Sequence, residues 1–143
     1  MGINQVVDPN IVISALLGIG NSYKVFDLNN VKQKFNFISP YYFLVELGSK
    51  TEKIAKKTKF SLEEVQEVLR FIVNQITFIP ESEYENKIKE ARQILKSNEE
   101  DVPYLALALK YNCEILSGDK LFKKFCPEKV KNPKEILRIF YSN

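Results

Sequence analysis

Short apolar runs alternate along this chain with longer segments in which apolar residues recur every three or four positions. Residues 5–8 form the first run and predict a short buried strand, and Pro9 suits the first position of a helix that extends to Leu17. Residues 76–79 form a similar run, which Pro80 ends. Further strands are predicted at residues 35–38 and 114–117, with a marginal one at Val130.

The segments between these strands have the spacing of amphipathic helices. The sequence Ser-Leu-Glu-Glu at residues 61–64 is a capping box, so we expect a helix over residues 62–73. Apolar residues at helical spacing from Tyr84 to Leu95 predict another helix up to about Lys96. The other predicted helices cover residues 40–57, 102–111, a short segment ending at Phe125, residues 133–141, and a short, irregular piece over residues 23–28.

Short strands that alternate with helices predict an α/β fold, in which a mostly parallel sheet carries helices on both faces. The 143 residues contain no repeat and no linker, so we expect one domain over residues 1–143. No apolar stretch has membrane-spanning length, and the N-terminus has no basic leader. We therefore expect a cytoplasmic protein without a membrane anchor.

Composition narrows the chemistry of the chain. It has no His, and its two cysteines, Cys113 and Cys126, have neither the number of a disulfide framework nor the spacing of a zinc site. The formal net charge of +3 is mildly basic. Such a charge is compatible with mere solubility, but beside a local acidic cluster it also suits a polyanionic substrate.

Four acidic residues interrupt or end apolar segments: Asp8, Glu46, Asp101 and Asp119. A carboxylate beside core residues is costly unless a cation collects it. Clustered carboxylate oxygens without imidazole suit a hard cation such as Mg²⁺ or Mn²⁺, which points to metal-dependent chemistry on a phosphate ester.

The predicted topology can bring these four residues to one edge of the sheet. Asp8 and Asp119 follow strands at their carboxyl ends, where sites form in parallel sheets. Three of the four also precede helices, so N-capping is an alternative for each, and Glu46 alone could be a solvated side chain. Taken together, however, they would repel one another unless a cation were bound.

Several neighbouring residues could serve the same site or have ordinary structural roles. Ser117 could hold Asp119 or a metal-bound water, although a Ser-Gly turn is equally plausible. Other candidates are the amide of Asn10, the carboxylates of Glu99 and Glu100, the basic residues Lys120, Lys123 and Lys124 as phosphate contacts, and Tyr41 and Tyr42 as stacking platforms.

Four ordered motifs resemble those of PIN domains. The first is Val-Asp-Pro-Asn-Ile-Val-Ile-Ser-Ala-Leu at residues 7–16, and the second is Leu-Val-Glu-Leu at residues 44–47. The third is Glu-Asp-Val-Pro-Tyr-Leu-Ala-Leu-Ala-Leu at residues 100–109, and Ile-Leu-Ser-Gly-Asp at residues 115–119 is the fourth. Order, spacing and context match over nearly the whole chain.

PIN domains are α/β/α nucleases, many of them toxins of prokaryotic toxin–antitoxin pairs. The resemblance implies a three-layer α/β/α sandwich around a twisted sheet. It also implies an acidic tetrad of Asp8, Glu46, Asp101 and Asp119, with Ser117 in support. An antitoxin protein as partner and a homodimer are implied in the same way.

The resulting hypothesis is hydrolysis of RNA phosphodiester bonds that depends on Mg²⁺ or Mn²⁺, which the acidic tetrad would hold. Glu46 would orient or deprotonate the attacking water. One alternative is a module of the same fold that binds RNA or protein without cutting. Another is an aspartate phosphoacceptor, which would need a second Asp near Asp8 where Asn10 stands.

Overall fold

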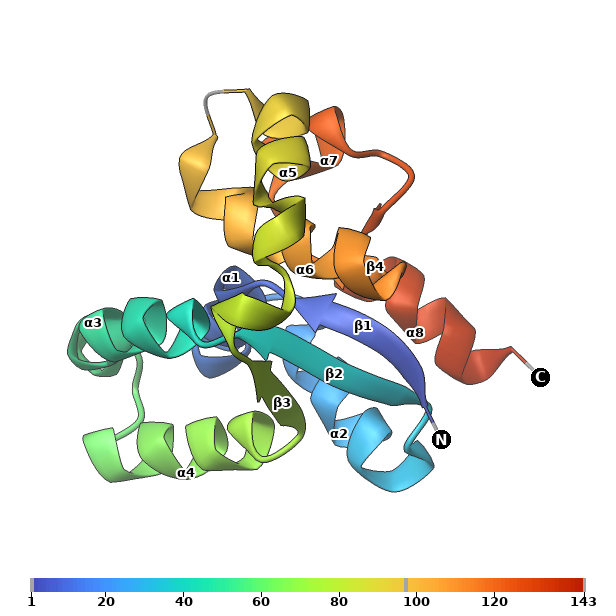
Figure 1. The fold of residues 1–143 in the computed structure, drawn as a ribbon. Helices are drawn as coiled ribbons and strands as arrows, with labels where there is room; N and C mark the ends of the chain where they lie inside the picture. The colour runs from blue at the N-terminus through green and yellow to red at the C-terminus, as the bar shows by residue number, and fades with distance from the viewer. Residues whose placement is uncertain (1, 97, 143) are drawn as a thin grey trace.

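The computed structural model describes residues 2–96 and 98–142, and a sheet of five parallel strands lies at its centre (Figure 1). The strand order is β3-β2-β1-β4-β5, and every described strand pair is parallel. The parallel sheet predicted from the alternating pattern is therefore confirmed. The strands are β1 (Ile3–Val7), β2 (Phe35–Pro40), β3 (Ile76–Ile79), β4 (Glu114–Leu116) and β5 (Val130–Lys131).

Helices follow the strands in the expected order. Several are capped as the sequence predicts: Ser61 and Glu64 form the capping box of α4, and Pro9 is the first residue of α1. The helices are α1 (Pro9–Leu16), α2 (Ser22–Lys32), α3 (Tyr42–Lys57), α4 (Leu62–Val73), α5 (Ile88–Leu95), α6 (Val102–Tyr111), α7 (Lys120–Phe125) and α8 (Pro133–Tyr141), with short 3-10 helices at Glu81–Glu83, Glu85–Lys87 and Glu99–Asp101.

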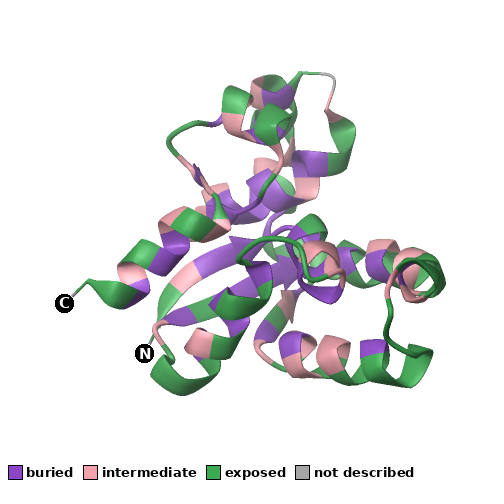
Figure 2. Cartoon of the chain, turned by 180° about the vertical axis from the view of Figure 1, so that it is seen from behind, coloured by how far each residue is buried: buried purple, intermediate pink, exposed green. Residues whose placement is uncertain are grey.

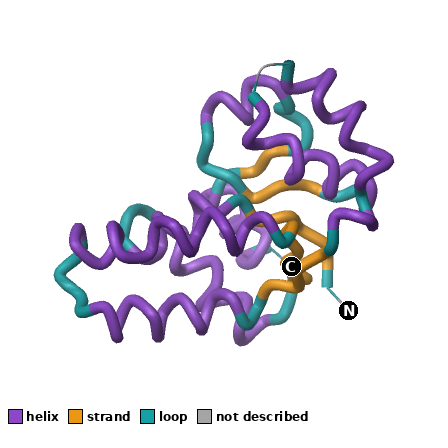
Figure 3. The backbone as a smooth tube through the Cα atoms, turned by 60° about the vertical axis from the view of Figure 1, so that its left-hand side comes forward, coloured by secondary structure: helices purple, strands orange, loops and turns teal. Residues whose placement is uncertain are grey.

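Helices cover both faces of the sheet and give a three-layer α/β/α sandwich (Figures 1 and 3). On one face, Phe26 of α2 packs on Phe37 with ring centroids 5.3 Å apart, and Phe140 of α8 packs on Phe35 at the same distance. Helix α6 packs on β1 and β2 from the other face, and α5 covers α6. Because both faces are covered, the central strands are mostly buried (Figure 2).

Helices α3 and α4 form a pair that extends beyond the sheet (Figure 3). Only the start of α3 lies near the carboxyl edge of the sheet, since Tyr41, which precedes it, donates its backbone N–H to Ile79 at 3.4 Å. This arrangement places the first turns of α3 beside the strand ends and the rest of the helix away from them.

The structure corrects three local predictions. Helix α2 is a regular helix of 11 residues rather than a short, irregular one, because Val25, Phe26 and Asn29 bury one of its faces. Strand β2 continues through Pro40, so the following helix begins at Tyr42. Tyr84 lies between two 3-10 helices and not in α5, although its ring is buried as its apolar spacing suggested.

Among the described residues, no helix combines the length and apolar character needed to cross a membrane. Cys113 and Cys126 are both free.

Candidate active site

The candidate site lies where the two central strands end. β1 ends at Val7 and β4 ends at Leu116, and the backbone N–H of Asp8 donates to the carbonyl of Leu116 at 3.1 Å. In the strand order β3-β2-β1-β4-β5, the strands that follow β1 are added on one side of it up to β3 and on its other side from β4 onward. The carboxyl ends of β1 and β4 therefore flank the switch point of the topology. This is the place where sites form in open parallel sheets.

Asp8 is buried at the start of α1, with 2% of its surface exposed. Its Oδ1 accepts the backbone N–H of Asn10 at 3.2 Å, and its Oδ2 accepts the hydroxyl of Ser117 at 2.6 Å. Burial raises the pKa of Asp8 to about 6, and the negative charges of Asp119 and Glu46 add to the rise. Asp8 is thus both a helix cap and a carboxylate under electrostatic stress.

Asp101 is buried without acting as a helix cap. It precedes α6, but its side chain accepts no hydrogen bond from the helix; instead its Oδ2 accepts from the side-chain amide of Asn98. Burial, followed by the charges of Asp8 and Asp119, raises the pKa of Asp101 to about 7. The capping explanation that the sequence allowed is therefore wrong for Asp101.

Glu46 lies in the first turns of α3 and is half-buried. The hydroxyl of Tyr104, a residue only 1% exposed on α6, donates to its Oε1 at 2.6 Å. Burial raises the pKa of Glu46, and the charge of Glu100 adds to this, while the Tyr104 hydrogen bond and Lys50 oppose it. Glu46 is therefore held by a buried partner and is not a freely solvated side chain.

Asp119 caps α7, because its Oδ1 accepts the backbone N–H of Leu121 at 2.8 Å and that of Phe122 at 3.3 Å. Its own backbone N–H donates to the Ser117 hydroxyl at 3.1 Å. Ser117 thus connects the ends of β1 and β4 by donating to Asp8 and accepting from Asp119.

The four acids form one electrostatically coupled cluster. The charge of Asp119 acts on both Asp8 and Asp101, and the charge of Glu46 acts on Asp8. Within residues 2–96 and 98–142, none of the four forms an ion pair with Lys or Arg. The acids that the sequence singled out thus influence one another by charge, and none is paired with a Lys or Arg of the described residues, although the charge of Lys50 opposes the rise in the pKa of Glu46.

The donor set fits a hard divalent cation in kind, because it consists of carboxylates. Three oxygens make no hydrogen bond with the described residues: Oε2 of Glu46, Oδ1 of Asp101 and Oδ2 of Asp119. No three His, Cys, Asp or Glu side chains in the described part of the chain stand at metal-ligand spacing. Binding an ion would therefore require these side chains to turn toward a common point.

The other predicted contacts lie in different settings. Glu99 is held by Arg92 through hydrogen bonds of 2.6 to 3.1 Å, whereas Glu100 is exposed next to Asp101. Asn10 is exposed and lines a cavity of about 540 Å³ that also contacts Asp119.

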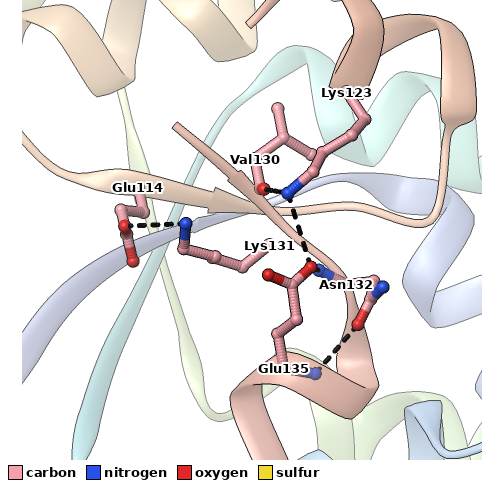
Figure 4. A network of polar contacts seen from close by, with 6 residues as sticks. All are labelled: Glu114, Lys123, Val130, Lys131, Asn132 and Glu135. Atoms are coloured by element: carbon pink, nitrogen blue, oxygen red, sulfur yellow. Dashed lines mark hydrogen bonds and ion pairs between the residues drawn. The ribbon is translucent and has the colours of Figure 1, made fainter. Parts of the chain in front are cut away.

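The lysines of α7 differ in what they contact. The ammonium of Lys123 donates to the carbonyl of Val130 at 2.6 Å and pairs with Glu135 at 3.4 Å (Figure 4). Lys120 and Lys124 are exposed. The basic patch therefore divides into one structural lysine and two that face solvent.

Sequence reasoning missed two donors in this site, Asn98 and Tyr104. Asn98 stands three residues before Asp101, in a segment that looked like a polar break. Tyr104 looked like a core residue of the apolar helix α6. Its hydroxyl was the available signal, because a buried Tyr hydroxyl needs a hydrogen-bond partner.

The chain matches a known protein family by sequence and known structures by fold. The family model for the PIN domain matches residues 6–131. No curated protein sequence matches the chain significantly.

Two solved structures share the fold. VapBC2 from Rickettsia felis, in a crystal structure bound to a DNA fragment from its promoter, superposes with a TM-score of 0.67 at 18% sequence identity, covering 91% of this chain and 98% of that chain. PAE2754 from Pyrobaculum aerophilum superposes with a TM-score of 0.71 at 12% identity, covering 99% of this chain and 91% of that chain. At these identities the likeness establishes the fold alone.

Proposed function

The chain belongs to the PIN domain family, and from this premise we propose that it is a ribonuclease that hydrolyses RNA phosphodiester bonds with Mg²⁺ or Mn²⁺. One observation carries the proposal. Four carboxylates from separate segments form a coupled acidic cluster at the switch point of the sheet, and none of them forms an ion pair with a Lys or Arg of the described residues. Such a cluster is costly for the protein to keep unless it serves to bind a cation.

Each acid has a role in this proposal. Asp8, Asp101 and Asp119 hold the ion, and Glu46 orients the attacking water or takes its proton. Ser117 keeps Asp8 in place through its 2.6 Å hydrogen bond. When bound, Mg²⁺ or Mn²⁺ lowers the pKa of a water and offsets the charge that develops on the phosphorus oxygens.

The RNA backbone approaches along the exposed residues beside the cluster. Lys120 and Lys124 are free to contact phosphates flanking the reacting one, and the exposed amide of Asn10 lies on the same side as Asp119. Lys123 is a weaker candidate because its ammonium is engaged by Val130 and Glu135.

We further propose that the chain acts as a toxin with an antitoxin protein as its partner. The fold of a VapBC2 protein, which crystallised with promoter DNA, supports this. An apolar cavity of about 390 Å³ between the α1–α2 turn and α4 is a candidate docking place, since Ile19 and Phe60 on its border are 59% and 51% exposed. Co-purification with the product of a neighbouring reading frame, lost in Ile19→Asp, is the test of the partner.

The test of the enzyme is cleavage of labelled RNA by purified protein with Mg²⁺ or Mn²⁺, with excess chelator, and in the variant Asp8→Asn. The wild-type protein should cut only with metal, and Asp8→Asn should reduce the rate by at least about 100-fold because the water is no longer activated. Asp27→Asn is the matched control, since Asp27 is an exposed residue of α2. Cleavage that persists unchanged in chelator and in Asp8→Asn would refute the proposal.

A second candidate is a module that binds RNA or protein without cutting. It is favoured by one observation, that no three acidic side chains among the described residues stand at metal-ligand spacing. Metal-loaded protein that binds RNA and never shortens it would favour this function over the nuclease.

A further inference from the structure

A second cavity adjoins the acidic cluster and has a different character. Its volume is about 480 Å³, within the range of small-molecule sites. It lies between the start of α3, the first 3-10 helix and the segment before α6. Its lining includes Tyr41, Tyr42, Glu81, Tyr84, Glu99 and Glu100.

The cavity and the acidic cluster share elements. Tyr42 lies one helical turn before Glu46 on α3, so both side chains project from the same face of that helix. Glu100, on the border of the cavity, is adjacent to Asp101, and its charge acts on both Glu46 and Asp101. A nucleotide chain whose phosphate lies at the cluster would therefore place a neighbouring base at this cavity.

Aromatic side chains supply flat surfaces in the cavity. The ring of Tyr41 packs against Phe78, with centroids 6.3 Å apart and planes at 30°, and the residue remains 54% exposed. It is thus held on one side and open on another, which suits stacking with a base.

Tyr84 provides an unused polar group. The residue is only 3% exposed and lines the cavity, and its hydroxyl has no hydrogen-bond partner among the described residues. The ring is buried, but the hydroxyl oxygen is not among the buried unpartnered atoms, so it is accessible and can donate to an acceptor on a ligand in the cavity.

The carboxylates of the cavity are not equivalent. Glu99 is occupied by Arg92, whereas Glu81 and Glu100 form no ion pair or side-chain hydrogen bond within the described residues. Among the residues that the structure describes, no Lys or Arg lines the cavity, so a phosphate would be repelled there. The two open carboxylates require N–H donors, while the Tyr84 hydroxyl can donate to a carbonyl oxygen.

Guanine carries this combination on one edge. Its N1–H and exocyclic amine are adjacent donors that one carboxylate can accept together, and its O6 is an acceptor for the hydroxyl. Uracil has one N–H between two carbonyls, cytosine has one amine and no ring N–H, and adenine has one amine. We propose that this cavity binds a guanine base of the RNA next to the scissile phosphate, stacked on Tyr41 and read by Glu81, Glu100 and Tyr84. This inference rests on the proposed ribonuclease function.

The test is a titration of isotope-labelled, metal-free protein with guanosine, adenosine, cytidine and uridine, followed by NMR. Nucleosides carry no phosphate, so neither a metal nor catalysis is needed. Guanosine should shift the signals of Tyr41 and Tyr84 and bind on the order of tenfold more tightly than the other three, as expected for a two-point contact to one base edge.

Variants connect the preference to the cavity. The double variant Glu81→Gln/Glu100→Gln should lose most of the guanosine preference, and Tyr84→Phe should lower it. Glu83→Gln/Glu85→Gln removes the same charge from exposed residues of the same segment that do not line the cavity, so it should bind guanosine like the wild-type protein.

Three results would overturn the inference: equal binding of all four nucleosides, no binding of guanosine, or an unchanged preference in Glu81→Gln/Glu100→Gln. N-acetylargininamide is titrated in parallel as a stand-in for a basic protein side chain. If it moves the Tyr41 and Tyr84 signals and guanosine does not, the cavity receives a basic protein side chain instead. If the protein cleaves RNA but does not bind guanosine, this inference alone is refuted. If it binds guanosine but never cleaves RNA, the proposed ribonuclease function is refuted.

Discussion

At the scale of single residues, neutral donors hold the acids of the site. Ser117 donates to Asp8, Asn98 to Asp101 and Tyr104 to Glu46. A neutral donor fixes the orientation of a carboxylate without cancelling its charge, whereas a lysine or arginine would cancel it. The carboxylates therefore stay oriented without an ion-paired lysine or arginine, and a cation would displace the protons that their raised pKa values favour.

The hydrogen bond between Tyr104 and Glu46 leads to the first prediction. Tyr104→Phe keeps the buried ring but removes the 2.6 Å donor, so Glu46 loses its fixed orientation. A hydrogen bond to a charged group is worth about 1.5–3 kcal/mol, so we expect kcat for RNA cleavage to fall roughly 10-fold to 100-fold while KM changes little.

Steady-state kinetics together with thermal unfolding separate this effect from a packing defect. Tyr111→Phe removes a hydroxyl from the same helix at a half-buried position and is the matched control. A fall in Tm with unchanged kcat would mean that Tyr104 serves the core and not Glu46.

Site residues could be predicted from the sequence only where a charged side chain stands among apolar neighbours. Asp8, Asp101 and Glu46 are carboxylates in apolar context, so they stood out. Asn98 did not stand out, because a polar residue in a polar loop is ordinary. Its role became visible only in the structure, where its side-chain amide donates to Asp101. The role of Tyr104 likewise depended on the approach of α3 to α6, which no local pattern contains.

At the scale of elements, the different contacts of Lys123 and Lys124 on α7 lead to a second prediction. Lys123 joins α7 to β5 and α8 through Val130 and Glu135, whereas Lys124 is exposed (Figure 4). Lys123→Met should lower the free energy of unfolding by about 1 kcal/mol, because it removes one hydrogen bond and one partly exposed ion pair.

Lys124→Met should leave stability unchanged and weaken RNA binding, with a smaller dependence on salt. Chemical denaturation and RNA binding at several salt concentrations, measured on both variants, distinguish the two roles. If Lys123→Met weakens RNA binding and leaves stability intact, the assignment of the two lysines is reversed.

Element boundaries show what periodicity can and cannot predict. The strands were recognised because a strand buried on both faces is a continuous apolar run, and this pattern is local. The regularity of α2 was missed because its polar residue Asn29 is buried, where its side chain exchanges hydrogen bonds with the backbone of Phe35 at 2.9 and 3.1 Å. Tertiary contacts of this kind override a weak helical pattern.

At the scale of the whole molecule, the buried acids connect stability to pH. The pKa of Asp8 is about 6 and that of Asp101 about 7 in the folded chain, both above the ordinary value of 3.8. Between pH 4 and 7 the folded state therefore holds more protons than the unfolded state, so the free energy of unfolding falls as pH rises through this window. One pKa unit corresponds to about 1.4 kcal/mol, so the loss by pH 8 is on the order of a few kcal/mol.

This linkage leads to the last prediction. Metal-free protein should have a higher Tm at pH 5 than at pH 8, and Asp101→Asn should raise Tm at pH 8 and flatten the pH dependence, because the amide cannot ionise. Asp27→Asn, at an exposed position, should do neither.

Mg²⁺ or Mn²⁺ should raise Tm of the wild-type protein more at pH 8 than at pH 5, where protons compete for the same carboxylates. Thermal unfolding at both pH values, with and without metal, measures all of these effects. A wild-type Tm that metal leaves unchanged at pH 8, or that rises from pH 5 to pH 8 without metal, would show that these acids are not an unneutralised cation site.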